Sequence, residues 1–187
     1  MTKVLLATGN PHKVAEIQAI LGDAWVVEAD DPGVEETGTT FEENALIKAR
    51  ALAQARGELA VADDSGIEVD ALGGAPGIRS ARWTDEGDWI PKVLRSLASA
   101  GAVAPEERGC RYVCAAAAVW PDGREVVVRG TVEGTVPDAP RGTGGFGYDP
   151  IMVPTEGDGR TFAEMPEAAK HALSHRGRAF RALATHL

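Results

Sequence analysis

Two adjacent carboxylates, Asp63 and Asp64, follow an apolar run at residues 59–62 (LAVA). The run predicts a buried strand, and side chains at the carboxyl end of such a strand face the crevice in which open α/β sheets bind ligands. Adjacent like charges are unfavourable unless a cation or hydrogen-bond donors offset them. Carboxylate oxygens suit Mg²⁺, which shares its other coordination sites with water and substrate phosphates. The pair therefore predicts a magnesium and phosphate site, with an exposed acidic turn as the alternative.

The stretch at residues 8–13 (TGNPHK) lies between a predicted strand and a predicted helix. Asn10 is a favourable N-cap and Pro11 a favourable first helical residue. Backbone N–H groups at the start of a helix, together with Lys13, are suited to binding an anion. An ordinary turn with an N-cap explains the same residues, so this stretch alone is a weak indication of phosphate binding.

Residues 40–49 (TFEENALIKA) begin with a capping-box pattern. In this pattern the side chain of Glu43 returns to Thr40 at the start of the helix, which gives Glu43 a structural role. Lys48 lies about one and a half turns further along the same helix, where a solvated side chain is the ordinary expectation for lysine.

Residues 142–149 (GTGGFGYD) combine four glycines with two aromatic residues. Glycine lets the backbone approach a ligand closely, and Phe146 offers a ring face on which a base could stack. A flexible hairpin end would also contain glycine, but it would not be expected to keep Phe146 and Tyr148 in water. The loop therefore indicates a site for a base or nucleoside.

Residues 170–176 (KHALSHR) form a basic segment at the end of a predicted helix. We expect Lys170 and Ser174, together with His171 and His175, to lie near one another there. A solvated basic face is the alternative, and the segment alone does not decide between the two.

Asp64-Ser65-Gly66 is also the triplet of the aspartic proteases, in which two such triplets share one proton across a dyad. The chain holds one copy, so a homodimer would have to supply the second. This alternative leaves the glycine-rich loops and the basic segment without a role.

The elements that must position these residues follow from hydrophobic periodicity and from turn signals. Strands are predicted at residues 3–7, 25–29, 59–62, 111–120 and 125–136, and a hairpin turn at 121–124 (PDGR) joins the last two. Helices are predicted between Pro11 and Gly22, between Thr40 and Gly57, around residues 89–97, and at 166–174 and 178–186. Strand–helix units followed by a hairpin predict an α/β fold with a mixed sheet, in a single domain over residues 1–187.

Composition limits the classes of partner. The 187 residues include 19 basic and 28 acidic ones, for a formal charge of −9, which disfavours binding to a nucleic-acid polymer or to an anionic membrane. Cys110 and Cys114 lie in one predicted strand and are expected to be reduced core thiols. The sequence shows neither a signal-peptide core nor a run long enough to span a membrane, so we expect a cytoplasmic protein.

Five motifs in order resemble the inosine triphosphate pyrophosphatase family across nearly the whole chain: TGNPHK, TFEENALIKA, ADDSGIEVDALGGAPGIRSAR, GTGGFGYDPI and K-x₄-HRG. Members hydrolyse non-standard purine nucleoside triphosphates (dITP, ITP, XTP) to the monophosphate and pyrophosphate. The resemblance implies an elongated two-lobed α/β fold around a central mixed sheet with flanking helices, and an active-site cleft between the lobes. It also implies Mg²⁺ dependence and a homodimer.

The resemblance further implies roles for the matching residues. Asp64 and Lys48 would be catalytic, with Asp64 as the general base, and Glu43 and Asp64 would hold the metal. The substrate-binding residues would be Thr8, Gly9, Asn10 and Lys13 at the triphosphate, Ser65 by the phosphates, Phe146, Gly147, Tyr148 and Asp149 at the nucleoside, and Lys170, His175 and Arg176 at the base. The chain departs from the family pattern at residues 88–92, at Met152 and at Pro166, which concerns the lobe or dimer interface more than the chemistry.

A nucleotide-binding sensor without turnover is the main competing class of function. Such a protein would use the same cations and aromatic rings, but it would need no carboxylate that acts as a base.

Overall fold

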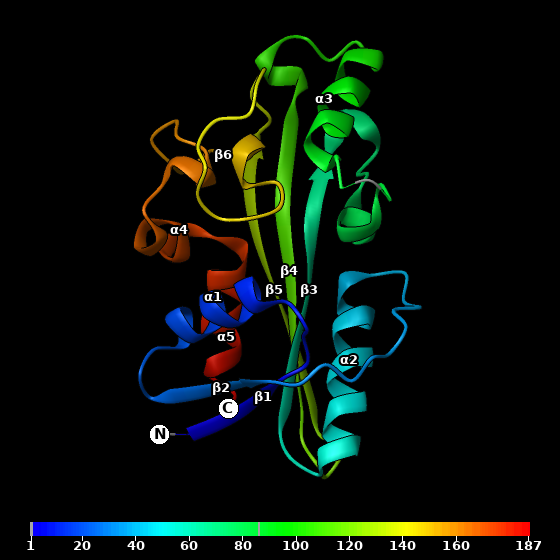
Figure 1. Cartoon of the computed structure of the whole chain (residues 1–187), viewed down its shortest axis with the longest axis vertical. Coiled ribbons are helices and arrows are strands. Elements are labelled where there is room, and N and C mark those ends of the chain that lie inside the picture. The colour runs from blue at the N-terminus through cyan, green and yellow to red at the C-terminus, as the bar shows by residue number, and fades with distance from the viewer. Residues whose placement is uncertain (1, 86) are drawn as a thin grey trace. The chain divides into compact units, whose positions relative to one another are not determined.

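Six strands form one sheet in the computed structural model of the chain, which describes residues 2–85 and 87–187 (Figure 1). Their order is β2-β1-β3-β4-β5-β6, with bounds β1 Thr2–Leu6, β2 Trp25–Ala29, β3 Ala60–Val69, β4 Gly109–Val119, β5 Glu125–Thr135 and β6 Val153–Pro154. β1 pairs in parallel with β2 and with β3, whereas β6 pairs antiparallel with β5. The prediction of a mixed sheet is confirmed.

Five α-helices accompany the sheet in the described part of the chain: α1 Pro11–Leu21, α2 Phe41–Arg56, α3 Trp89–Ser99, α4 Glu167–Leu173 and α5 His175–Ala184. The predicted caps of α1 are present, because the Asn10 side chain accepts from the His12 N–H and Gly22 ends the helix with a φ of 74°. α5 begins earlier than predicted, since Ser174, in extended backbone (ψ 154°), ends α4 and lets the next helix start at once.

Strand β3 differs most from expectation. A strand ending at residue 62 was expected, but β3 continues through Asp63 and Asp64 to Val69. The expectation rested on the apolar run, which ends at Ala62. It is wrong because cations from distant parts of the chain compensate these carboxylates where they lie.

The described contacts divide the chain into two compact units. One comprises Met1–Ser65, Cys114–Gly130 and His175–Leu187, and the other comprises Gly66–Val113 and Thr131–Ser174. The chain therefore passes from one unit to the other four times, after Ser65, Val113, Gly130 and Ser174. The expectation of a single domain stays a prediction.

The first unit has its own apolar core beneath α1 and α5, which pack against each other (Figure 1). β1 contributes Val4 and Leu6, and α1 contributes Ile17. Phe180 and Leu183 of α5 and Cys114 of β4 are also fully buried in this core. This core fixes the ends of β1, α1 and α5 from which polar side chains reach Asp63.

The second unit is built around Ile67 and Val69 of β3, with Val93 and Leu97 of α3. The rings of Tyr112 and Phe162 stack there at 5.7 Å between centroids, and those of Trp89 and Tyr148 at 5.9 Å.

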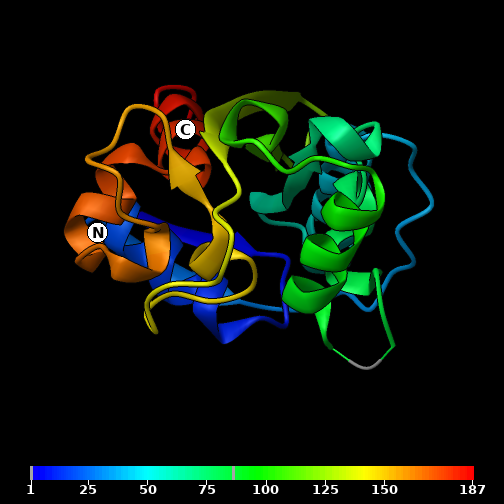
Figure 2. The same cartoon turned by 90° about the horizontal axis from the view of Figure 1, so that it is seen from above.

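A long loop of the second unit, residues 136–148, contains neither helix nor strand and is yellow in Figures 1 and 2. It folds back on two short 3₁₀ helices, Asp149–Ile151 and Phe162–Glu164. The Arg141 N–H donates to the Pro150 carbonyl at 2.9 Å, and the Gly144 N–H to the Ala163 carbonyl at 3.0 Å. The glycine-rich segment therefore has a defined path.

Both cysteines are buried free thiols, as predicted. Burial raises the pKa of the Cys110 thiol to about 12, and burial also raises the pKa of Cys114. Within residues 2–85 and 87–187, no helix has the length and apolar character needed to cross a membrane.

Candidate active site

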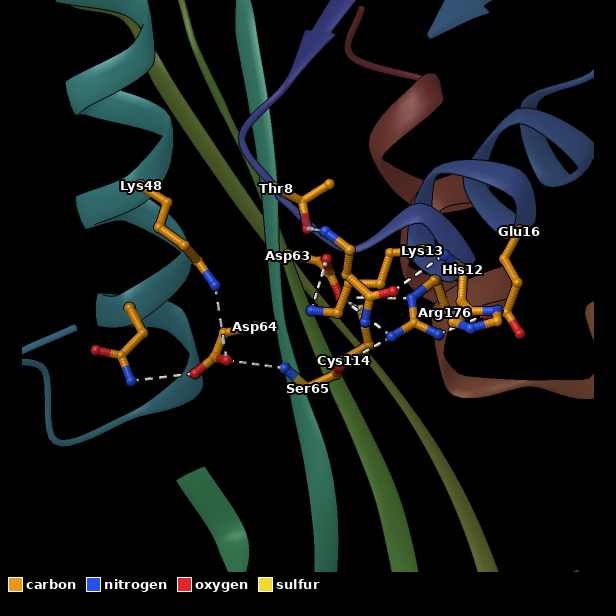
Figure 3. A network of polar contacts seen from close by, with 12 residues as sticks. Thr8, His12, Lys13, Glu16, Lys48, Asp63, Asp64, Ser65, Cys114 and Arg176 are labelled. Carbon is orange, nitrogen blue, oxygen red and sulfur yellow. Dashed lines mark hydrogen bonds and ion pairs between the residues drawn. The ribbon is translucent and has the colours of Figure 1, made fainter. Parts of the chain in front are cut away.

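Asp63 and Asp64 lie in the middle of β3, in the first unit, and their side chains point to opposite sides of the strand (Figure 3). Successive side chains of a strand alternate in this way. The exposed fractions of the two residues are 1% and 7%, so the alternative of an exposed acidic turn is wrong. Each carboxylate has its own set of partners.

Asp63 meets two cations. Its Oδ1 lies 3.0 Å from the Lys13 ammonium, and its Oδ2 lies 3.3 Å from Arg176 Nη2. The Cys114 thiol lies 3.9 Å from Oδ2. Burial raises the pKa of Asp63, but the charges of Lys13, Arg176 and Lys48 outweigh it and bring this pKa well below its usual range. Asp63 is therefore a buried carboxylate that stays ionised.

Arg176, at the start of α5, makes further contacts in the same cluster. Its Nη1 donates to Glu16 Oε2 at 2.5 Å, and its Nη2 donates to Ser65 Oγ at 2.9 Å. Burial lowers the pKa of the guanidinium, but Asp63 and Glu16 outweigh that and raise it. The guanidinium thus joins α1, β3 and α5 around one carboxylate (Figure 3).

Asp64 faces α2. Asn44 Nδ2 donates to its Oδ2 at 3.1 Å, the Ser65 N–H donates to its Oδ1 at 3.1 Å, and the Lys48 ammonium lies 3.8 Å from Oδ1. Burial raises the pKa of Asp64, Lys48 offsets part of this shift, and the nearby Glu36 adds to it. The two neighbouring carboxylates therefore have pKa values displaced in opposite directions, an arrangement by which enzymes give two acids different roles.

Lys48 is not the solvated lysine of the ordinary expectation. Its side chain is 14% exposed, and its ammonium lies 2.6 Å from Glu36 Oε1 as well as near Asp64. Burial lowers its pKa, but Asp63, Asp64 and Glu36 together outweigh burial and raise it. A fixed positive charge next to Asp64 suits a phosphate oxygen.

Glu43 has the predicted structural role, with a shift of one residue in its partner. Thr40 Oγ1 accepts from the Glu43 N–H at 3.1 Å, as in a capping box. The Glu43 carboxylate accepts from the Thr39 N–H at 2.6 Å and from Thr39 Oγ1 at 2.9 Å. These hydrogen bonds, the backbone one foremost, lower the pKa of Glu43. Its role as a metal ligand stays a prediction.

The turn at residues 8–10 has the predicted form. Thr8 Oγ1 accepts from the Asn10 N–H at 3.2 Å, and Asn10 Oδ1 accepts from the His12 N–H at 2.9 Å. At Gly9 a Cβ atom would lie 2.8 Å from Asp31 Oδ2, so a larger residue there would displace this exposed carboxylate.

A second polar cluster surrounds Asp149 in the second unit. The Lys170 ammonium donates to Asp149 Oδ2 at 2.6 Å, the Phe146 N–H donates to the same oxygen at 2.9 Å, and the Tyr112 hydroxyl donates to Oδ1 at 3.2 Å. The Lys170 ammonium lies 5.1 Å from the centroid of the Phe146 ring. Asp149 therefore fixes both an aromatic ring and a cation.

Tyr148 and the glycines complete this loop. The Tyr148 hydroxyl donates to the Ser80 carbonyl at 2.7 Å, and burial raises its pKa. Gly147 has a φ of 61°, in the left-handed region that favours glycine. At Gly145 a Cβ atom would overlap the Asp149 carboxylate.

The basic segment is divided between the two units. Lys170 and Ser174 belong to the second unit, whereas His175 and Arg176 belong to the first. All four are buried, so the alternative of a solvated basic face is wrong. Lys170 contacts Asp149, and Arg176 contacts Asp63.

Sequence reasoning missed four polar residues of these clusters: Glu16, Glu36, Asn44 and Tyr112. Two of them carried a usable signal, because Glu16 lies three positions after Lys13 and Asn44 four positions before Lys48, on shared helix faces. Glu36 is in a loop without periodicity, and Tyr112 had the pattern of a core strand residue.

The side chains near Asp64 offer carboxylate oxygens, which are the type of ligand that a divalent cation such as Mg²⁺ prefers. Asp64 and Glu36 flank Lys48, so the three side chains carry one negative charge in excess. In the part of the chain that the structure describes, no three His, Cys, Asp or Glu side chains form a ready set of metal ligands. An ion bound there would draw on one or two carboxylates and complete its coordination with water and phosphate oxygens, as Mg²⁺ commonly does.

Known proteins resemble the chain over its full length. A curated dITP/XTP pyrophosphatase of Streptomyces coelicolor is 54% identical over 192 residues, covering 98% of this chain and 96% of that protein. The solved structure of a nucleoside-triphosphatase / dITP/XTP pyrophosphatase from Mycobacterium abscessus is 43% identical with a TM-score of 0.75, covering 100% and 99% of the two chains. A HAM1 protein from Coxiella burnetii is 36% identical with a TM-score of 0.84, covering 99% and 98%.

The model of the Ham1 family matches residues 4–186. The resemblance inferred from the five motifs is thereby confirmed, and the chain belongs to the Ham1 family.

Proposed function

We propose that the chain is a nucleoside-triphosphate pyrophosphatase, which hydrolyses dITP, ITP and XTP to the monophosphate and pyrophosphate and so removes non-standard purines from the nucleotide pool. Family membership and the names of the relatives support this activity. The observation that carries it in this chain is the pair Asp63–Asp64, buried on opposite sides of β3, with Asp63 between Lys13 and Arg176 and Asp64 beside Lys48. An aspartic protease does not fit the family, and Asp64 faces Lys48 and Asn44 rather than a second acid.

Asp64 is the base in this proposal. Water attacks the α-phosphorus, pyrophosphate leaves, and the Asp64 carboxylate accepts the proton of the attacking water. A carboxylate with an ordinary pKa of about 4 is a weak base for water, so the role depends on a bound ion that would acidify or position the attacking water. Lys48 and Lys13 neutralise phosphate oxygens as negative charge shifts to the leaving group.

We assign a Mg²⁺ ion to Asp64 and Glu43. Asn44 is the chain neighbour of Glu43 and donates to Asp64, so α2 connects the two proposed ligands. When bound, the ion would lower the pKa of the attacking water and neutralise phosphate charge.

The remaining predicted contacts form two groups. We assign the triphosphate to Thr8, Gly9, Asn10, Lys13 and Ser65, and the base and nucleoside to Phe146, Gly147, Tyr148, Asp149, Lys170, His175 and Arg176. The stacked position of Lys170 over the Phe146 ring supports base binding by the second unit. We also propose that the protein is a homodimer and acts in the cytoplasm.

One assay separates this proposal from a nucleotide sensor. The protein is incubated with ITP and Mg²⁺, and IMP and pyrophosphate are measured, with ATP as the matched substrate control. We expect equimolar IMP and pyrophosphate from ITP. ITP binding without pyrophosphate release would instead favour the sensor, and release of inorganic phosphate in place of pyrophosphate would contradict attack at the α-phosphorus.

A further inference from the structure

Asp63 is the more deeply buried of the two carboxylates, and both of its oxygens are in contact with cations. Its side chain is 0% exposed, against 10% for Asp64. Oδ1 faces Lys13 and Oδ2 faces Arg176, at 3.0 and 3.3 Å. Neither oxygen is exposed to water, so Asp63 is poorly placed to bind a hydrated ion or to activate a water molecule.

The charges around Asp63 balance without a metal ion. Asp63 and Glu16 carry two negative charges, and Lys13 and Arg176 carry two positive ones. Asp64 is different, because its side chain is less deeply buried and its oxygens meet Asn44, the Ser65 N–H and one cation, Lys48, rather than two cations. A divalent ion therefore finds a more accessible carboxylate on the Asp64 side of β3 than on the Asp63 side.

Both cations that Asp63 contacts, Lys13 and Arg176, are expected to contact the substrate. A lysine side chain has four rotatable bonds, and ordering it costs conformational entropy. A rigid carboxylate on the central part of β3 removes much of that freedom before substrate arrives, and Arg176 is further fixed by Glu16 and Ser65. Preorganised cations stabilise a transition state without reorganisation at the moment of reaction.

We propose that Asp63 is a positioning residue of the reaction, which holds Lys13 and Arg176 in the orientation that binds substrate and touches neither the metal nor the attacking water. This inference rests on the proposed pyrophosphatase activity. The two carboxylates then have different roles: Asp64 contacts the reacting atoms, and Asp63 orients the cations that contact the substrate.

The test is a double-mutant cycle on kcat/KM for ITP with Lys13→Met, Asp63→Asn and both changes. We expect each single change to lower kcat/KM by roughly 100-fold, mainly through KM for Asp63→Asn, because a misplaced cation loses about as much as a deleted one. The double variant should lie within about fivefold of Lys13→Met alone, since Asp63 then has no Lys13 to orient and Arg176 is still held by Glu16 and Ser65. A double variant that loses the full product of the two single losses overturns the proposal.

The matched control is Asp64→Asn in the same Lys13→Met background. Asp64 is the adjacent residue and takes the same substitution, but its proposed role does not pass through Lys13. The factor by which Asp64→Asn lowers kcat should therefore be the same in the parent and in the Lys13→Met background. The Mg²⁺ concentration for half-maximal activity should also stay within about twofold in Asp63→Asn, and a tenfold increase would instead identify Asp63 as a metal ligand.

Asp63→Asn alone leaves the buried Arg176 and the partly exposed Lys13 with one carboxylate, Glu16, and this imbalance of charge works against folding. The double variant restores neutrality and should fold, as checked by circular dichroism and its melting temperature. If the single variant does not fold, a double variant that lies more than about fivefold below Lys13→Met still overturns the proposal.

The parent protein is assayed first. Absence of pyrophosphate release from ITP would contradict the proposed function, and the same cycle is then measured as affinity for inorganic pyrophosphate by calorimetry. In that measurement too, an Asp63→Asn loss that persists at full size without Lys13 overturns the positioning role.

Discussion

The Lys170 ammonium donates to Asp149 Oδ2 at 2.6 Å, and both side chains are 4% exposed. The same oxygen accepts from the Phe146 N–H, so one buried ion pair sets the conformation of the glycine-rich loop. Removal of one partner from a buried pair leaves an uncompensated charge. The pair is thus both a structural contact and part of the proposed base site.

Asp149→Asn should lower the free energy of unfolding by about 3 to 5 kcal/mol, because it leaves Lys170 buried without its counter-ion. It should also raise KM for ITP, since the Phe146 N–H loses a charged acceptor. Asp138→Asn in the same unit is the control, because the Asp138 side chain is 92% exposed, and its effect on unfolding should be within about 0.5 kcal/mol. Urea unfolding monitored by circular dichroism gives both values. Equal stabilities of the two variants would contradict a structural role for the pair.

At pH 7 without added metal, Asp63→Asn should destabilise the protein, whereas Asp64→Asn should not. Asp63 has a lowered pKa in the folded state, so its ionised form stabilises the fold, and its loss should cost about 3 to 5 kcal/mol. Asp64 has a raised pKa, so its ionised form opposes folding, and Asp64→Asn should leave stability unchanged or raise it by about 1 kcal/mol.

The pH dependence of the stability of Asp63→Asn follows from the direction of the Asp63 pKa shift. The stability that ionised Asp63 supplies is complete above its unfolded pKa of about 4 and is lost as the pH falls below that value. The difference between the parent and Asp63→Asn should therefore shrink on acidification from pH 5 downward. Unfolding titrations at a series of pH values measure it, and a difference that grows toward low pH would contradict the buried counter-ion.

Asp64→Asn should remove at least roughly 100-fold of kcat for ITP while affinity for ITP stays within about tenfold. The amide has nearly the shape of the carboxylate but cannot accept the proton of water. Steady-state kinetics give kcat, and calorimetric titration gives the affinity. Parental turnover in this variant would mean that Asp64 is not the base.

Glu43→Gln should raise the Mg²⁺ concentration needed for half-maximal activity with little change in melting temperature. The amide oxygen still accepts from the Thr39 N–H, so most of the cap is kept, but an anionic ligand is lost. Thr40→Ala is the control, since it removes the side chain that accepts from the Glu43 N–H, at about 1 kcal/mol, and should not alter the Mg²⁺ requirement. If neither variant changes the requirement, Glu43 is only a cap.

Substrate preference should follow the order ITP and XTP, then GTP, then ATP in kcat/KM. Hypoxanthine and xanthine present a 6-keto acceptor to the donors of Lys170, His175 and Arg176, whereas the 6-amino group of adenine leaves buried donors unpaired, at about 1 to 3 kcal/mol each. Guanine has the same 6-keto group, so it can be distinguished only by its 2-amino group. Steric exclusion of that group should lower kcat/KM for GTP by roughly 10- to 200-fold. Comparison of the four triphosphates at saturating Mg²⁺ measures the order. ATP turned over as well as ITP would contradict both the donors and the proposed function.

Local signals in the sequence were sufficient for most elements. The caps of α1 and α2, with Asn10 and Gly22 at one helix and Thr40 and Gly57 at the other, act over a few residues and were predicted correctly. The order of the five motifs also identified the family, because each motif is a continuous stretch of the chain.

The partners of Asp63 and Asp64 were decided only by the tertiary structure. A carboxylate that follows an apolar run predicts the end of a strand, because a buried charge is unfavourable without a partner. The sequence does not show which distant cation will supply that partner. Arg176 lies 113 positions after Asp63, and yet its guanidinium replaces the water that an exposed carboxylate would need. The residue types were therefore readable from the sequence, but the burial and charge balance that separate the two carboxylates depend on α1, α2 and α5 packing around β3.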